Sequence, residues 1–172
     1  MERLQPILEA ITPVDRSLEA KIRAHLDNLT KPLGSLGFLE DLAANYCLMT
    51  GTTTPQLGKK RIVTFAGDHS VAAEGVSAYP SEVTPQMVYN MLAGGAAINV
   101  LAKHLGADLQ VVDIGVADPL EGATGILRRK VKSGTDNMSR GPAMTEEEAI
   151  QAILVGVELA HAAADDGVTL LG

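Results

Sequence analysis

Short apolar segments alternate with longer helical patterns along the second part of the chain. Three of these segments, Arg61–Ala66, Leu109–Ile114 and Val168–Leu171, have the length and apolar content of buried strands. Between them, residues 84–105 and 145–157 carry apolar side chains at helical spacing. This alternation predicts an α/β fold, a Rossmann-like parallel sheet with flanking helices and right-handed crossovers.

Individual residues mark the ends of the two helical stretches. Thr84 followed by Pro85 predicts an N-cap and a first helical position, and Gly106 predicts a C-terminal stop. Thr145 and Glu148 have the spacing of a capping box. The apolar face expected on the helix that follows consists of Ile150, Ile153, Leu154 and Val157.

The first 58 residues have a different pattern and predict a separate helical segment. One helix is expected over Asp15–Leu29, because Pro32 stops an α-helix. Ser35 is a candidate N-cap for a second helix that ends at Gly51. The apolar stripe expected on that helix includes Leu36, Leu39, Leu42 and Ala43. The chain is therefore expected to consist of a helical segment, residues 1–58, and a partial α/β domain, residues 59–172.

The charge balance limits the partners that the chain can have. A formal net charge of -7 and a pI near 5.0 disfavour nucleic acid and anionic membranes. Cys47 is the only cysteine, which excludes an intramolecular disulfide and fits a reducing compartment. No export signal or long uninterrupted apolar run is present, so a cytoplasmic location is expected.

Polar residues follow the first predicted strand at once. Asp68 and His69 can act as an acid/base pair, or Asp68 can bond loop amides while His69 packs under the loop. The two roles are equally compatible with the spacing. Convergence of these residues with Asp113 would make a metal-dependent hydrolase, but no known metal-ligand spacing occurs, so no metal site is predicted.

Two further features allow a functional and a structural interpretation. The loop Ser133–Met144 is rich in small polar residues and exposes amides that can hold a phosphate, or it is a long connection after a basic edge strand, Gly125–Lys132. Met87 and Met91 can line a pocket for a flat aromatic ligand, although ordinary core packing explains either one.

Many separated motifs match one family in order and spacing. They are Lys31–Gly37 followed by Leu39-Glu40, Phe65–Ser70, Glu74–Ser77, Tyr79-Pro80, Val83-Thr84, Gln86-Met87, Val112–Val116, Gly134-Thr135, Asn137 and Gly141–Met144. From about Leu26 to Gly172 the chain resembles the N-terminal half of the nicotinate-nucleotide:dimethylbenzimidazole phosphoribosyltransferase family. Ser70 is a local departure, because many relatives have glycine there.

The resemblance implies a reaction and a set of site residues. Such enzymes transfer the phosphoribosyl group of nicotinate mononucleotide to 5,6-dimethylbenzimidazole and need no metal or other cofactor. Residues 59–172 would then be part of a nucleotide- and base-binding domain. The substrate-binding residues implied by the matching motifs are Asp68, His69, Tyr79, Pro80, Gln86, Met87, Asn137, Gly141, Pro142 and Met144.

The resemblance also implies that the chain is truncated. Family members are much longer, and their phosphate-binding glycine loop and catalytic glutamate correspond to positions beyond Gly172. The chain is therefore expected to be weak or inactive alone. The alternative is a non-catalytic binding or oligomerisation module, or a subunit of a split enzyme. A homodimer is expected in either case, because a partial sheet exposes an edge and apolar helix faces.

Overall fold

The computed structural model describes residues 2–172, which divide into two units, Glu2–Leu57 and Gly58–Gly172. The first unit is helical. Its helices are α1 (Gln5–Ala10), α2 (Glu19–Asp27) and α3 (Phe38–Thr50). Ile22 of α2 packs with Ala44 and Leu48 of α3, so this helix pair forms a small core of its own.

Helix α3 buries a different face from the one expected. The buried residues are Glu40, Ala44, Cys47 and Leu48, whereas Leu36, Leu39, Leu42 and Ala43 are exposed. Glu40 is ion-paired with Lys31 at 2.9 Å and accepts the Leu36 N–H at 3.1 Å. The hydrogen bond from Lys31 lowers the pKa of Glu40. The face of α3 that carries Glu40 is therefore turned toward the core of this unit. The Ser35 N-cap prediction is also wrong, because Gly37 holds the N-cap position.

The second unit contains a four-stranded parallel sheet with the order β3-β2-β1-β4. Its strands are β1 (Lys59–Gly67), β2 (Ala107–Gly115), β3 (Ile126–Arg128) and β4 (Val168–Leu171). The predicted α/β fold with a parallel sheet is therefore confirmed. The basic edge segment is shorter than expected, since only three of its residues form β3.

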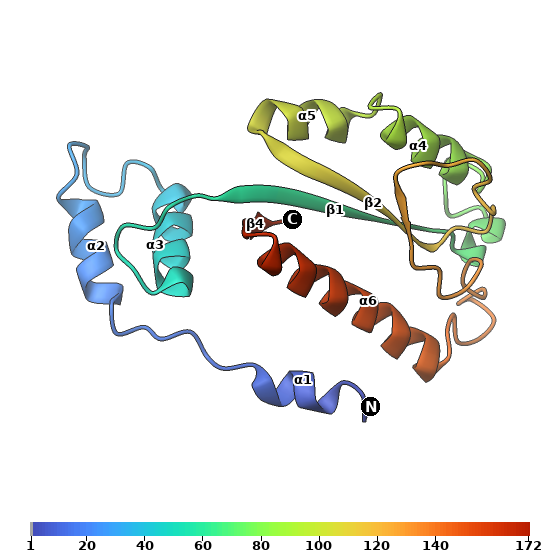
Figure 1. The fold of residues 1–172 in the computed structure, drawn as a ribbon, viewed down its shortest axis with the longest axis horizontal. Helices are drawn as coiled ribbons and strands as arrows, with labels where there is room; N and C mark the ends of the chain where they lie inside the picture. Colours follow the sequence, from blue (N-terminus) through green and yellow to red (C-terminus); the bar gives the residue numbers. More distant parts are fainter. Residues whose placement is uncertain (1) are drawn as a thin grey trace. The chain divides into compact units, whose positions relative to one another are not determined.

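Helices cover both faces of this sheet, as Figure 1 shows. On one face lie α4 (Val83–Leu92) and α5 (Ala97–Leu105), which connect β1 to β2. On the other face lies α6 (Glu146–Asp165), which connects β3 to β4. Neighbouring valines of β2 separate the two cores, because side chains alternate along a strand. Val111 packs in the cluster that includes Val88 of α4, and Val112 packs with Val155 and Leu159 of α6.

The helix ends agree only in part with the sequence. Thr145 and Glu148 form the predicted capping box, and Gly106 ends α5 in the left-handed conformation. Helix α4 begins two residues early, at Val83 with Glu82 as its N-cap, so Thr84 is not its N-cap and Pro85 is not its first residue. The structure buries Ile150, Val155, Leu159 and Ala163 on α6, whereas Ile153 of the expected face is 52% exposed.

The strand order sets the place where a ligand can bind. Strand β1 has β2 on one side and β4 on the other, and the crossovers that lead to these two strands cover opposite faces of the sheet. In open α/β sheets, ligands bind beyond the carboxyl ends of the strands at this change of direction. Within residues 2–172, no helix is both long and apolar enough to cross a membrane.

Candidate functional site

Asp68 lies at the point where the loops after β1, β2 and β3 meet. Its Oδ2 accepts the Ala117 N–H at 2.7 Å, and its own N–H donates to the Gly115 carbonyl at 3.0 Å. Its carbonyl oxygen accepts the Thr135 N–H at 2.9 Å. The buried carboxylate therefore bonds a loop amide, as the structural interpretation of Asp68 expected. His69 is exposed, so the part of that interpretation that packed it under the loop is wrong.

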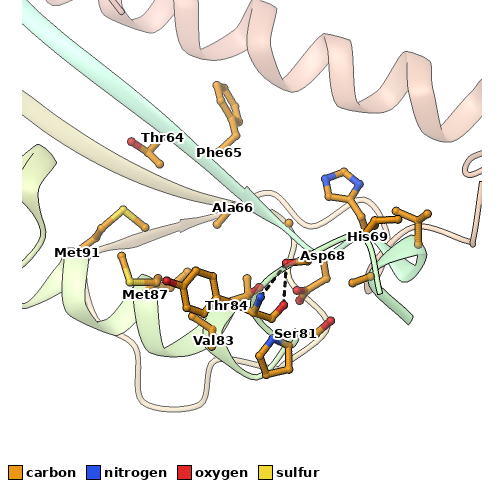
Figure 2. A pocket seen from close by; sticks show the side chains of 18 residues that line it. Thr64, Phe65, Ala66, Asp68, His69, Ser81, Val83, Thr84, Met87 and Met91 are labelled. Carbon is orange, nitrogen blue, oxygen red and sulfur yellow. Dashed lines mark hydrogen bonds between the residues drawn. The ribbon is translucent and has the colours of Figure 1, made fainter. Parts of the chain in front are cut away.

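A cavity of about 410 Å³ opens beside Asp68 on the side of β1 that α4 covers. Met87 and Met91 lie next to each other on α4 and both line it, and the side chains of Phe65 and Ala66 leave β1 in opposite directions (Figure 2). The predicted site residues that line this cavity are Asp68, His69, Tyr79, Pro80 and Met87. Its walls are mostly apolar, which suits a flat uncharged ring.

A second hollow, of about 490 Å³, shares Asp68 with the first. Gln86 lines this hollow together with Ala117 and Asp118, whose turn follows β2. Tyr89, one helical turn after Gln86, also lines it and donates a hydrogen bond to the Glu121 carbonyl at 2.9 Å. Gln86 therefore lies at the same rim as Asp68, in the hollow next to that of Met87.

A third hollow, of about 310 Å³, is lined by residues of β1 and by Ala152 of α6. Met144 lines it, together with Phe65, His69 and Thr135. The Thr135 hydroxyl oxygen is buried and has no hydrogen-bond partner within residues 2–172. Lys132 also lines this hollow, and its hydrogen bond to Asp136 raises the pKa of its ammonium group.

Buried charges shape the turn that follows β2. Asp113 is 1% exposed, and its Oδ1 accepts the Val116 N–H at 2.9 Å. Its Oδ2 lies 3.4 Å from Lys130 Nζ, which also donates to the carbonyls of Val116 and Asp118 at 2.6 and 2.9 Å. Asp113 thus supports the backbone. Nowhere in the described part of the chain do three His, Cys, Asp or Glu side chains gather as a metal site would require.

Comparison with known proteins decides the family. A family model described as phosphoribosyltransferase (DBI_PRT) matches residues 11–172. The chain belongs to this phosphoribosyltransferase family.

Curated and solved members of the phosphoribosyltransferase family are close in sequence and in fold. The nicotinate-nucleotide–dimethylbenzimidazole phosphoribosyltransferase of Chlorobaculum tepidum is 58% identical over 170 residues, which cover 99% of this chain and 48% of the relative. The protein of the same name from Geobacter sulfurreducens is 54% identical over 172 residues, which cover 100% of this chain and 49% of that relative. The crystal structure of a nicotinate-nucleotide-dimethylbenzimidazole phosphoribosyltransferase from Thermus thermophilus superimposes with a TM-score of 0.84 at 48% identity. That match covers 91% of this chain and 48% of the solved one, so the chain spans about half the length of the relatives it matches.

The predicted site residues of the 133–144 loop do not line the first cavity of this phosphoribosyltransferase chain. The amide nitrogen of Asn137 donates to Glu74 at 2.6 Å, and its oxygen accepts from Ser139 N–H and Oγ at 3.0 and 2.7 Å. Gly141 and Pro142 are not among the residues that line the three hollows. Asn137 thus ties its loop to the segment that follows β1.

The sequence did not lead us to Glu74 and Lys130, two residues of this chain that organise the site. Glu74 joins Asn137 and Arg140, and the matching motif Glu74–Ser77 was a signal for it that the set of site residues left out. A signal for Lys130 existed, because a charge such as Asp113 within an apolar strand needs a partner when it is buried.

Proposed function

We propose that this chain forms one wall of the active site of a phosphoribosyltransferase that acts on nicotinate mononucleotide and 5,6-dimethylbenzimidazole. The products would be α-ribazole 5′-phosphate and nicotinate. The activity for which the relatives are named supports this reaction. The observation that carries it is the cavity beside Asp68, which five of the predicted substrate-binding residues line at the ligand end of a parallel sheet.

The first cavity is the proposed site of the benzimidazole ring. Its volume lies within the range of about 300–1,000 Å³ that small-ligand pockets occupy. Met87 and Met91 supply deformable apolar surface for a flat ring. Asp68 would act mainly as a positioning residue, because its carboxylate holds the Ala117 turn.

The reaction needs more than this wall. A benzimidazole nitrogen attacks the ribose carbon, the bond from that carbon to the pyridinium nitrogen breaks, and the electron pair leaves with nicotinate. A general base must then remove the proton from the other benzimidazole nitrogen. We propose that this general base belongs to the part of the relatives that the chain does not match, so we expect binding of benzimidazole with little or no turnover.

Release of nicotinate tests the proposed reaction. The chain is mixed with nicotinate mononucleotide and 5,6-dimethylbenzimidazole, and nicotinate is followed by chromatography, with the full-length Chlorobaculum tepidum relative as positive control. We expect a rate at least about 10²-fold below that of the relative, the typical contribution of a general base. A rate equal to that of the relative would refute the incomplete site.

The coverage of about half of each relative also favours a second function, a non-catalytic binding module or a subunit of a split enzyme. The two proposals differ in a measurable way. A binding module retains its affinity for the base and shows no turnover at any enzyme concentration. Slow turnover that disappears in a Met87→Asp variant would instead favour the enzyme.

We further propose that the chain forms a homodimer and works in the cytoplasm. Three side chains on α5, those of Val100, Leu101 and Leu105, are each more than half exposed and supply apolar surface for such a contact. Light scattering measures the mass directly. A monomer at micromolar concentration would contradict the dimer.

A further inference from the structure

The corner between α4 and α5 follows a defined backbone path. Gly94 adopts a φ of 81°, a left-handed conformation that glycine tolerates best. The N–H groups of Gly94 and Gly95 donate back to the last turn of α4, to the carbonyls of Met91 at 3.1 Å and Asn90 at 2.9 Å. The chain therefore turns sharply out of α4 before α5 begins.

Asn99 of α5 joins the two helices across this corner. Its Oδ1 accepts the N–H of Ala96, the N-cap residue of α5, at 3.1 Å. Its Nδ2 donates to the carbonyl of Met91 at 2.9 Å. That carbonyl also accepts the Gly94 N–H, so both of its lone pairs are used. One half-buried amide therefore caps α5 and holds the last turn of α4.

Met91 lies toward the inner end of the first cavity. Asp68 directly follows β1, whereas Thr64, which also lines the cavity, lies within the strand. Helix α4 runs back along the sheet from the Asp68 end, so Met87 precedes Met91 on the way inward (Figure 1). In Figure 2, Met91 and Thr64 lie toward one end of the cavity and Asp68 toward the other.

The chemistry of the proposed reaction orients the ring in this cavity. The benzimidazole nitrogen that attacks must face the ribose, which belongs at the rim where the loops after the strands meet. The 5 and 6 positions lie on the opposite edge of the bicyclic ring, so their methyl groups point inward, toward Met91. The position of Met91 therefore decides how much room the methyl-bearing edge finds.

We propose that Asn99 is a positioning residue of the base-binding cavity. By holding the Met91 carbonyl, Asn99 fixes the inner wall on which the two methyl groups pack, and it makes the cavity selective for a ring substituted on that edge. Asn99 itself lines none of the three hollows, so it acts through Met91. This role rests on the proposed function, because it belongs to the same cavity.

The affinities for benzimidazole and for 5,6-dimethylbenzimidazole, both measured by NMR titration, test this role. For the unaltered chain we expect the methyl groups to strengthen binding about tenfold, the gain typical of burying two such groups. Asn99→Asp keeps the acceptor for the Ala96 N–H and loses the donor to the Met91 carbonyl. It should reduce the preference for the dimethyl ring to about twofold and should shift the Met91 methyl signal even without base.

Control variants separate this role from a general effect on folding. Asn99→Ser has a hydroxyl that can accept the Ala96 N–H but is shorter than asparagine, so its preference should fall in the same way. Lys103→Gln changes an exposed residue of the same helix and should keep the preference. Thermal melting shows which variants fold.

The outcomes are distinct. Positioning by Asn99 is refuted by a folded Asp or Ser variant that keeps the tenfold preference or loses affinity for both rings equally. Failure of both variants to fold would also refute it, because Asn99 would then act on stability alone. If the unaltered chain bound neither ring, the base-binding cavity itself would be refuted, and Asn99 would have nothing to position.

Discussion

The turn after β2 and the loop before α6 both border the candidate site, but they are held in different ways. Buried groups hold the turn, since Asp113 is 1% exposed and Lys130 donates to two of its carbonyls. Exposed groups hold the loop, where Glu74 joins Asn137 and Arg140. Buried ion pairs are costly to break, whereas exposed ones contribute little. The turn is therefore a rigid frame, and the loop is the part that can adjust to a ligand.

Replacement of Asp113 tests the frame and should have the largest effect. Asp113→Ala leaves Lys130 without its anionic partner and the Val116 N–H without an acceptor, which should cost about 3–5 kcal/mol of unfolding free energy. Urea denaturation measures this loss. Asp108→Ala is the matched control, because it removes an exposed carboxylate from the same strand and should cost less than about 1 kcal/mol. Equal losses of unfolding free energy for the two variants would show that the buried Asp113 does not make the turn after β2 a rigid frame.

Asp68 connects the frame to the cavity, and its loss should have an intermediate effect. Asp68→Ala removes the acceptor of the Ala117 N–H and should cost about 1.5–3 kcal/mol, the range for hydrogen bonds to charged groups. Asp68→Asn keeps an acceptor oxygen and should restore most of the stability. If the asparagine variant were as unstable as the alanine variant, the bond to Ala117 would not be what Asp68 contributes.

The capping box at the start of α6 fixes the far end of the adjustable loop. Thr145→Ala should cost about 1 kcal/mol. The hydrogen bond from the Thr145 N–H lowers the pKa of Glu148 below its ordinary value of 4.5. The contribution of Glu148 to stability is therefore complete above its unfolded pKa and is lost as the pH falls through the lower folded pKa. Glu148→Gln should flatten this acid-side loss in melts recorded between pH 6 and pH 3, and an unchanged slope would disprove the linkage.

The exposed contact of Glu74 should matter least for stability and most for loop motion. Glu74→Gln should change the unfolding free energy by less than about 1 kcal/mol. It should nevertheless speed hydrogen exchange in residues 133–144, because the tie to Asn137 is weakened. The exposed Glu82→Gln serves as control and should leave that exchange unchanged. A large loss of stability in Glu74→Gln would place this loop in the rigid frame.

Periodicity predicted the sheet well, because alternation of strands and helices leaves few topologies for a parallel sheet. It failed where a polar group decides which face of a helix is buried. Glu40 is buried with its partner Lys31, and Leu39 and Leu42 of α3 are exposed. No hydrophobic pattern records such a pairing.

Prediction of the site from the sequence was limited in the same way, because part of its geometry depends on tertiary contacts. The motifs indicated Asp68, Tyr79 and Met87, and these three line one cavity. The conformation of Leu120 could not be predicted, because its φ of 53° is unfavourable for leucine. Burial of its side chain and a hydrogen bond from Arg128 to its carbonyl at 2.8 Å hold it there, and both depend on tertiary contacts.

The central claim is that the cavity beside Asp68 binds the flat base. Titration of the chain with 5,6-dimethylbenzimidazole, followed by amide and methyl NMR spectra, tests this claim most directly. The account predicts saturable shifts that are largest at Asp68, Met87 and Met91. Shifts confined to other surfaces, or no saturable shift at millimolar base, would contradict it.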